Sequence, residues 1–120
     1  MSALNELRPG LVVDAILGYG LQGAPRGRTR ELIEWAVASP APVLSLDIPS
    51  GVDPDSGANA GVVVRPHATL TLALPKTGLV VAETGELWLA DLGIPSEVCR
   101  RIGLQYESPF GDRFLVPLRR

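Results

Sequence analysis

Two aspartates stand at the ends of apolar segments, where a carboxylate can carry chemistry. Asp14 is the one polar residue of Leu11–Leu17, and Asp47 lies near the end of Pro42–Ile48. An ionised carboxylate in an apolar strand is costly unless a cation or a set of hydrogen bonds compensates it. The sequence shows no fixed lysine or arginine beside either aspartate, so a bound cation or an acid–base role would explain them. The alternative is that each carboxylate only accepts hydrogen bonds from loop amides.

A glycine-rich loop follows the first of these segments. Gly18–Gly23 reads G-x-G-x-x-G, a spacing that lets backbone approach a pyrophosphate, and Asp47 ends the next strand where a ribose-binding acid would lie. Pro25 and Gly27 delay the helix, so the usual geometry with a phosphate at the helix N-terminus is not expected. A glycine turn without any ligand is the alternative.

The remaining polar candidates have ordinary explanations. Asp53-Pro54-Asp55 begins like a calcium loop, but an EF-hand needs glycine and glutamate where this sequence has Ala58 and Val64. We therefore interpret the two carboxylates as solvated turn residues. Ser50 lacks the G-x-S-x-G context of an exposed nucleophile, which favours a ligand or a turn residue.

Three further residues are weaker candidates. Lys76 follows a predicted strand and is expected to be an exposed turn lysine, and Cys99 is expected to be a small residue on the inner face of a helix. His67 and Cys99 are the only histidine and cysteine. Their number excludes an intramolecular disulfide, a Cys/His zinc cluster and any catalytic site that needs a second histidine.

The elements that position these residues form a β-α-β unit. Leu11–Leu17 is apolar on both faces, which is typical of a strand covered on both sides in a parallel sheet. A helix is predicted from near Arg28 to Ser39-Pro40, and Pro42–Ile48 is the next strand, reached by a right-handed crossover. Later in the chain the sequence predicts a loop over 49–57, strands over Ala68–Leu74 and Glu86–Leu92, and a helical turn over Ser96–Ile102. This pattern indicates an α/β fold with a mostly parallel sheet and with ligands at the carboxyl ends of its strands.

Composition sets the remaining limits. The 120 residues are 46% hydrophobic and 20% charged, which predicts one globular domain, with a core of about 10–104 and an irregular tail over 105–120. The net charge is −2 and the basic residues are dispersed, so nucleic acid is not an expected partner. Apolar runs are too short for a membrane span, and the first residues do not resemble a signal peptide. We therefore expect a cytoplasmic protein.

Four blocks in this order resemble the YjeF N-terminal domain family of NAD(P)H-hydrate epimerases: Asp14–Leu21, Pro42–Asp53, Leu74–Leu79 and Ala90–Pro95. The D-I-P-S-G-x-D motif at Asp47–Asp53 is the most specific of them. The resemblance covers roughly residues 10–96. It implies a Rossmann-like three-layer α/β/α fold that interconverts the R and S forms of hydrated NADH or NADPH, as a repair step that feeds a dehydratase.

The resemblance also implies roles for individual residues. Asp14 and Ser50 would hold one potassium ion per subunit, and Asp47 would lie at the reactive ring of the substrate as the acid–base residue. NAD(P)H hydrate would be a substrate rather than a cofactor, and it would contact the loop formed by Gly18, Tyr19, Gly20, Leu21, Gln22, Gly23 and Ala24.

Two departures from the family pattern leave alternatives open. Family members carry an earlier half with an N-N-G-G-D-G turn, whereas the asparagines here are only Asn5 and Asn59, and some members have a basic residue where this chain has Gln22. A homodimer or a complementing N-terminal half would have to supply the missing contacts. The alternatives are a non-catalytic nucleotide-binding or interaction module, or an inactive fragment. Preference for NADH or NADPH is open, because Arg26, Arg28 and Arg30 are equal candidates for a 2′-phosphate contact.

Overall fold

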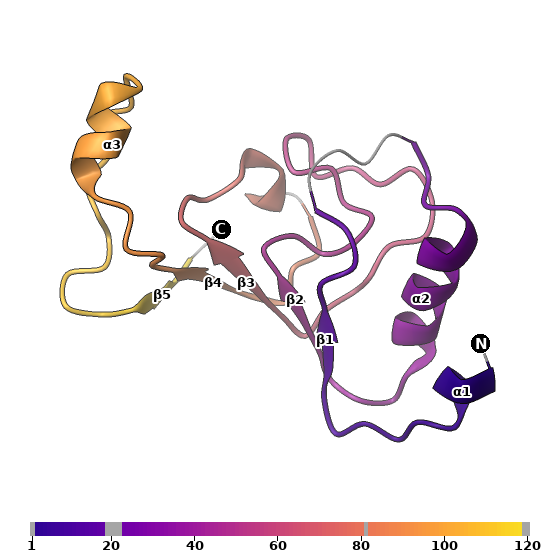
Figure 1. Ribbon diagram of the computed structural model, residues 1–120. Helices are drawn as coiled ribbons and strands as arrows, with labels where there is room; N and C mark the ends of the chain where they lie inside the picture. Colours follow the sequence, from indigo (N-terminus) through magenta and orange to yellow (C-terminus); the bar gives the residue numbers. More distant parts are fainter. Residues whose placement is uncertain (1, 19–22, 81, 119–120) are drawn as a thin grey trace.

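The computed structural model describes residues 2–18, 23–80 and 82–118, and strands from this part of the chain form one five-stranded sheet (Figure 1). The strands are β1 (Val12–Asp14), β2 (Val43–Leu46), β3 (Ala68–Leu72), β4 (Glu86–Ala90) and β5 (Leu115–Pro117). They lie side by side in sequence order; β1 to β4 are parallel and β5 is antiparallel to β4. The α/β class with a mostly parallel sheet is therefore confirmed.

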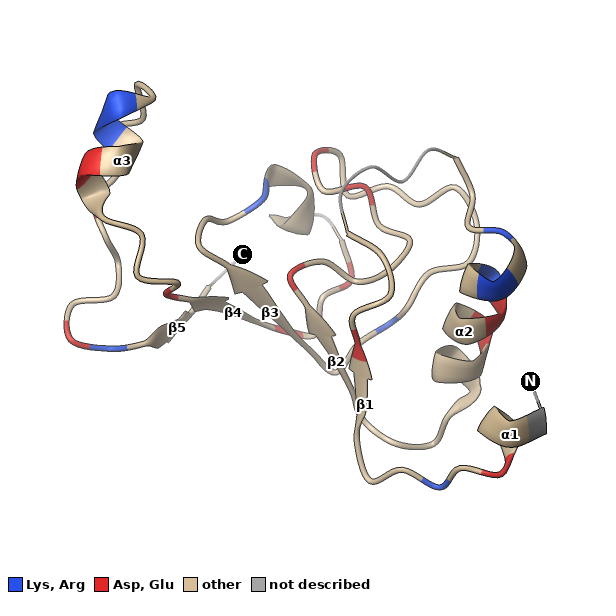
Figure 2. Ribbon diagram, in the orientation of Figure 1, with Lys and Arg blue, Asp and Glu red and all other residues tan. Residues whose placement is uncertain are grey.

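The predicted β-α-β unit is present at one end of this sheet. Helix α2 (Gly27–Ala38) connects β1 to β2, and its C-cap Ser39 has extended backbone before Pro40. Its buried residues Ile33 and Ala36 pack against Val12 of β1 and Val43 of β2. Figure 2 shows residues of both charge signs on the outer side of this helix, where Arg30 pairs with Glu34 at 2.8 Å. The short helix α1 (Ser2–Asn5) lies beside α2 (Figure 1).

The two faces of the sheet differ in burial. Side chains alternate between faces along a strand, so Val12 and Val43 point toward α2, and Val13 and Leu44 point away from it. Val12 is buried, whereas Val13 is 50% exposed. The prediction that the first strand is covered on both sides is therefore wrong for the described part of the chain. The reason is that α2 packs on the face that carries Val12, and the described residues leave Val13 on the other face half exposed.

The C-terminal region contains order that the sequence did not indicate. The tail over 105–120 is not irregular throughout, because β5 pairs with β4 and Val116 packs with Leu89 and Phe110 in a small core. A three-residue strand is too short to show a period, which is why the pattern missed it. Helix α3 (Ser96–Arg101) confirms the predicted helical turn and lies at the far end of the molecule from α2 (Figure 1). Among the described helices none is long and apolar enough to span a bilayer.

Candidate functional site

A buried carboxylate lies at the carboxyl end of β1. Asp14 is 1% exposed. Its Oδ2 accepts hydrogen bonds from Ser45 Oγ at 2.7 Å and from Ser50 N at 2.9 Å. Its Oδ1 accepts a hydrogen bond from Ser50 Oγ at 2.5 Å and a longer one from Ile16 N at 3.4 Å. No lysine or arginine of the described residues forms an ion pair with this carboxylate. Hydrogen bonds from neutral groups are therefore what stabilise it in the part of the chain that the structure describes.

The sheet register and one loop bring these groups together. Asp14 lies opposite Ser45 in the β1·β2 ladder, which places the Ser45 hydroxyl beside the carboxylate. Ser50 reaches it because the loop after β2 turns back toward the end of β1. Gly51 makes this return possible: its φ is +101°, and a Cβ there would lie 2.5 Å from the carbonyl oxygen of Val62. Ser50 Oγ also accepts a hydrogen bond from Leu17 N at 2.9 Å, which ties the loops after β1 and β2 together.

The second aspartate has a different environment. Asp47 directly follows β2 and has a φ of +66°, the left-handed region that residues other than glycine rarely adopt. Its Oδ1 accepts three hydrogen bonds, from Thr71 Oγ1 at 3.1 Å, Leu72 N at 3.0 Å and Lys76 Nζ at 2.5 Å. Its Oδ2 accepts none from the described residues. The side chain as a whole is 24% exposed, so part of this carboxylate group is accessible to solvent or to a ligand.

Lys76 is not the exposed turn lysine that the sequence indicated. Its side chain is only 12% exposed, and its Nζ donates to Asp47 and also to Thr71 Oγ1 at 3.1 Å and the carbonyl oxygen of Leu72 at 2.7 Å. The expectation that no fixed cation lies beside Asp47 is therefore wrong as well. The two residues are 29 positions apart, so spacing along the chain concealed the pair. The available signal was that both follow neighbouring parallel strands, β2 and β3, whose carboxyl ends meet at one edge.

The glycine loop is described only in part. Tyr19, Gly20, Leu21 and Gln22 lie outside the described residues, so the contacts expected of them are not placed. Gly18, Gly23 and Ala24 are described. Ala24 packs against the loop after β2, because a Cβ on Gly61 would lie 2.9 Å from the Ala24 side chain. Helix α2 begins at Gly27, which confirms that the glycine pattern does not open a helix.

Two polar residues of the sequence are occupied in ordinary structural roles. His67 accepts a hydrogen bond at Nδ1 from Val43 N, so it pairs with backbone rather than with Ser50. Asp53 accepts hydrogen bonds from the backbone amides of Asp55 and Ser56 at 2.8 and 2.9 Å, which confirms a solvated turn. Both bonds lower the pKa of the exposed Asp53 carboxyl, the one from Ser56 more than the one from Asp55.

The single cysteine, Cys99, lies beside a cavity near the C-terminus. Cys99 is buried on α3, as expected of a small residue on the inner face of a helix. It lines a cavity of about 390 Å³ together with Tyr106, whose hydroxyl is buried and finds no hydrogen-bond partner in the described part of the chain. Burial raises the pKa of Tyr106, and the nearby Cys99 and Asp91 add to this effect.

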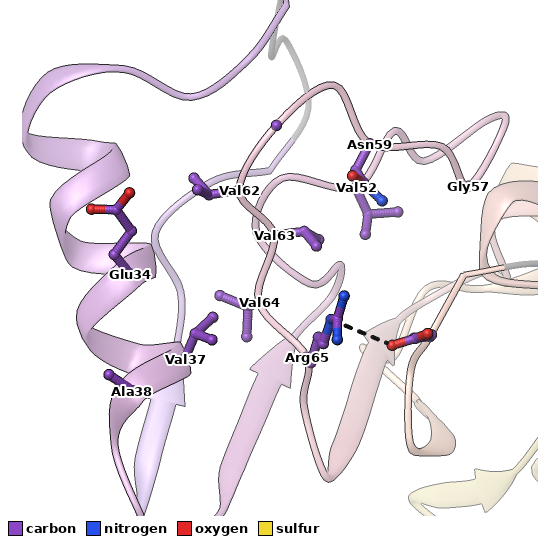
Figure 3. A pocket seen from close by; sticks show the side chains of 12 residues that line it. Glu34, Val37, Ala38, Val52, Gly57, Asn59, Val62, Val63, Val64 and Arg65 are labelled. Atoms are coloured by element: carbon purple, nitrogen blue, oxygen red, sulfur yellow. Dashed lines mark ion pairs between the residues drawn. The ribbon is translucent and has the colours of Figure 1, made fainter.

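A wide groove lies away from both aspartates. It measures about 670 Å³ and runs between α2 and the loop over 52–65, where Figure 3 shows valines on its walls together with Arg65, which pairs with Glu83. That pair is exposed and 3.7 Å long, which makes it a weak surface interaction. The described lining of the groove offers no buried titratable group. We therefore place the candidate site at the carboxyl ends of β1, β2 and β3, where Asp14, Asp47 and Lys76 lie.

The donor types at this edge limit the metal that could bind. The described residues contain no group of three or more His, Cys, Asp or Glu side chains arranged to hold a metal ion. The polar atoms near Asp14 are oxygens of one carboxylate, hydroxyls and backbone carbonyls, among them Leu17 O at 3.5 Å from Ser50 Oγ. Such oxygens suit a hard cation.

Comparison with known proteins gives a consistent result. The family described as YjeF-related protein N-terminus matches residues 1–78. The NAD(P)H-hydrate epimerase of Dehalogenimonas lykanthroporepellens is 57% identical over 109 residues, which are 90% of this chain and 44% of that protein. The epimerase of Truepera radiovictrix is 41% identical, over 87% of this chain and 48% of its own length. The bifunctional NAD(P)H-hydrate repair enzyme Nnr of Salinibacter ruber is 42% identical, over 83% of this chain and 19% of that protein.

A solved structure gives the same fold. The crystal structure of yeast ynu0 superposes with a TM-score of 0.70 at 23% identity, over 91% of this chain and 46% of that one. At this identity the likeness supports the fold alone. The chain spans less than half the length of these relatives.

Proposed function

The chain belongs to the YjeF N-terminal family, and from this membership we propose that it acts in the interconversion of the R and S forms of hydrated NADH and NADPH. The observation that carries the proposal is the Asp47 carboxylate. One of its oxygens is fixed by three donors, and the other accepts no hydrogen bond from the described residues, at the edge of the sheet where ligands of parallel α/β folds bind. A fixed, partly exposed carboxylate of this kind is suited to moving a proton.

The R and S forms have the same composition, so their interconversion has no net proton change and a single acid–base group is sufficient for it. A proton that leaves the substrate is replaced by another before the product is released. Asp47 Oδ2, which accepts no hydrogen bond from the described residues, serves as the acceptor and then the donor. The loop over Gly18–Ala24, which packs on the loop after β2 through Ala24 and Gly61, would hold the dinucleotide beside it.

Potassium is the cation we propose for the Asp14 site. The site fits this ion because Asp14 is buried without an ion pair among the described residues, and the Ser50 hydroxyl and the Leu17 carbonyl are nearby oxygen donors. Four hydrogen-bond donors already stabilise the carboxylate, so an ion of low charge is sufficient to complete its compensation. A bound potassium ion would supply positive charge toward an anionic substrate.

Partners follow from the length of the relatives. Because the chain spans less than half of the epimerases that it matches, we propose that a second copy or a complementing N-terminal half completes the substrate site. Relatives named as bifunctional repair enzymes support a functional link to a dehydratase. We propose a cytoplasmic location, where the pyridine nucleotides that would need this repair are used.

The test is turnover from a single epimer. Purified chain is mixed with one epimer of NADPH hydrate, and the other epimer is followed by chromatography in potassium chloride and in choline chloride. We expect turnover stimulated by potassium, and a loss of roughly 10²-fold or more in Asp47→Asn. Asp53→Asn is the matched control, because it removes an exposed carboxylate of the same loop.

The outcomes separate the candidate functions. A folded chain without turnover, alone and with a supplied N-terminal half, contradicts the epimerase proposal. Hydrate binding without turnover, measured by calorimetry, assigns a nucleotide-binding module instead. Equal activity in potassium and in choline contradicts the potassium proposal only.

A further inference from the structure

Lys76 forms an ion pair with Asp47, the proposed acid–base residue. It is the only lysine of the chain. An ammonium group has three donors, and this one has three acceptors: the Asp47 carboxylate, the Thr71 hydroxyl and the Leu72 carbonyl. With every donor satisfied and 12% of the side chain exposed, the Lys76 ammonium is held in one orientation.

The backbone around Lys76 is anchored on both sides. Before it, β3 ends at Leu72, and Ala73 has a φ of +63°, with Leu74 N donating to Leu72 O at 2.8 Å. After it comes the 3-10 helix η1 (Thr77–Val80). These two anchors leave the lysine little freedom to move relative to the end of β3.

The anchor that follows Lys76 is a close backbone contact. Gly78 of η1 packs so tightly on the loop after β2 that a Cβ there would lie 2.5 Å from Gly57 N. Thr77 Oγ1 donates to Asp55 O at 2.9 Å on the same loop. The segment that carries Lys76 is therefore fixed to the loop that begins at Asp47.

We propose that Lys76 is the positioning residue of this site: its ammonium fixes Oδ1 of Asp47, so that Oδ2 is the oxygen presented to the substrate. This inference rests on the proposed epimerase function. Three donors converge on Oδ1 and none of the described residues binds Oδ2, so the carboxylate cannot exchange its two oxygens without breaking all three bonds. Holding a reacting group in one geometry removes an entropic part of the barrier.

The charge of Lys76 matters as well as its position. Thr71 and Leu72 already supply neutral donors to the same oxygen. A cation adds a charge-assisted bond, which is stronger than the bonds from these two neutral donors. A neutral side chain of the same length would therefore keep the fold and lose the function.

The first test reads the contact without reference to activity. Because Lys76 is the only lysine, one side-chain ammonium signal is expected in a proton–nitrogen correlation spectrum, and it requires no assignment against other lysines. We expect slow exchange of its protons with water in the wild-type chain, and exchange at least about tenfold faster in Asp47→Asn. Asp53→Asn should leave the signal unchanged. Rapid exchange in the folded wild-type chain overturns the inference, whatever the activity is.

The second test reads the chemistry. In a chain that interconverts the epimers, Lys76→Met should lower kcat by roughly 10²-fold and change KM by less than about threefold, with Lys76→Arg less affected. In Lys76→Ala, added ethylamine should restore part of kcat, whereas ethanol should not. Wild-type kcat in Lys76→Met, or equal rescue by ethanol, overturns the inference. Absence of turnover in the wild-type chain overturns the proposed function instead. The ammonium signal distinguishes this result from failure of the Lys76 inference, because it reports the Lys76–Asp47 contact without any activity.

Discussion

Removal of one hydroxyl, in Ser50→Ala, tests the network that holds the two loops at the Asp14 carboxylate. The substitution deletes the bond from Ser50 Oγ to Asp14 Oδ1 and the bond from Leu17 N to Ser50 Oγ. The bond from Ser50 N to Asp14 stays, because it is made by backbone. The change is therefore confined to one side-chain oxygen in a site that is almost completely buried.

The magnitude follows from what each bond contributes. A hydrogen bond to a buried charge contributes about 1.5–3 kcal/mol, and an amide bond at a partly buried position about 1 kcal/mol. We therefore expect Ser50→Ala to lower the free energy of unfolding by about 3 kcal/mol, and the melting temperature by roughly 10 °C in a domain of this size. Ser45→Ala removes only the bond to Asp14 Oδ2 and should cost about 2 kcal/mol.

Urea unfolding followed by tryptophan fluorescence measures both variants. Ser45 is the matched control, because it is a fully buried serine on the same carboxylate with one bond in place of two. A cost for Ser50→Ala below that for Ser45→Ala would refute the reasoning. So would a cost below about 0.5 kcal/mol for both variants, the range of a surface substitution.

Three further predictions concern single positions. Gly51→Ala should lower the free energy of unfolding by at least about 2 kcal/mol, because a Cβ at this position would have an unfavourable φ and would lie 2.5 Å from a backbone oxygen. Gly93→Ala should cost only about 1 kcal/mol, because Gly93 has a φ of +74° but nothing within 4 Å of a Cβ. Equal costs for the two variants in urea unfolding would contradict this. Tyr106→Phe should raise the free energy of unfolding by roughly 1 kcal/mol, because it removes a buried hydroxyl without a partner. The raised pKa of Tyr106 means that its ionisation opposes folding, so stability does not depend on this group below the ordinary tyrosine pKa of about 10 and falls as pH rises from there through the raised folded value. Thermal melts at high pH should show this loss in the parent and not in the phenylalanine variant. The lowered pKa of Asp53 contributes stability above the ordinary aspartate pKa of about 4 and loses it as pH falls through the lowered value, so Asp53→Asn should flatten this acid limb in melts, and an unchanged limb would contradict the assignment.

The elements near the aspartates were predictable because burial and chain continuity determine them. The apolar segments around Asp14 and Asp47 became β1 and β2, and the stripe between them became α2. Both strands are shorter than the apolar runs. β1 stops at Asp14 because the next residues turn toward Ser50, which accepts the Leu17 amide. An apolar run alone does not show where a strand ends, because the loop that follows β1 is fixed by the Ser50 hydroxyl, 33 positions further along the chain than Leu17.

The parts of the candidate site that were missed depend on contacts far apart in the chain. Lys76 binds Asp47 across 29 positions, and only the β2·β3 register explains why they meet. The sequence also did not show that only one face of the sheet is covered at β1. Val12 and Val13 are the same residue type and differ only in the face toward which they point. Asp14 and Ser50, by contrast, which the family resemblance assigned to one site, are in contact through the Ser50 hydroxyl, and their role in holding potassium stays a prediction.

The two tryptophans lie on opposite sides of the sheet, which has a spectroscopic consequence. Trp35 belongs to α2, and its Nε1 donates to the Leu4 carbonyl at 3.0 Å, so its emission reports whether α1 stays docked. Trp88 of β4 is level with Leu70 and points to the face away from α2. Trp35→Phe therefore leaves a single fluorophore on that face. The emission maximum of Trp88 and its quenching by acrylamide then measure how far this face of the sheet is exposed to solvent in solution.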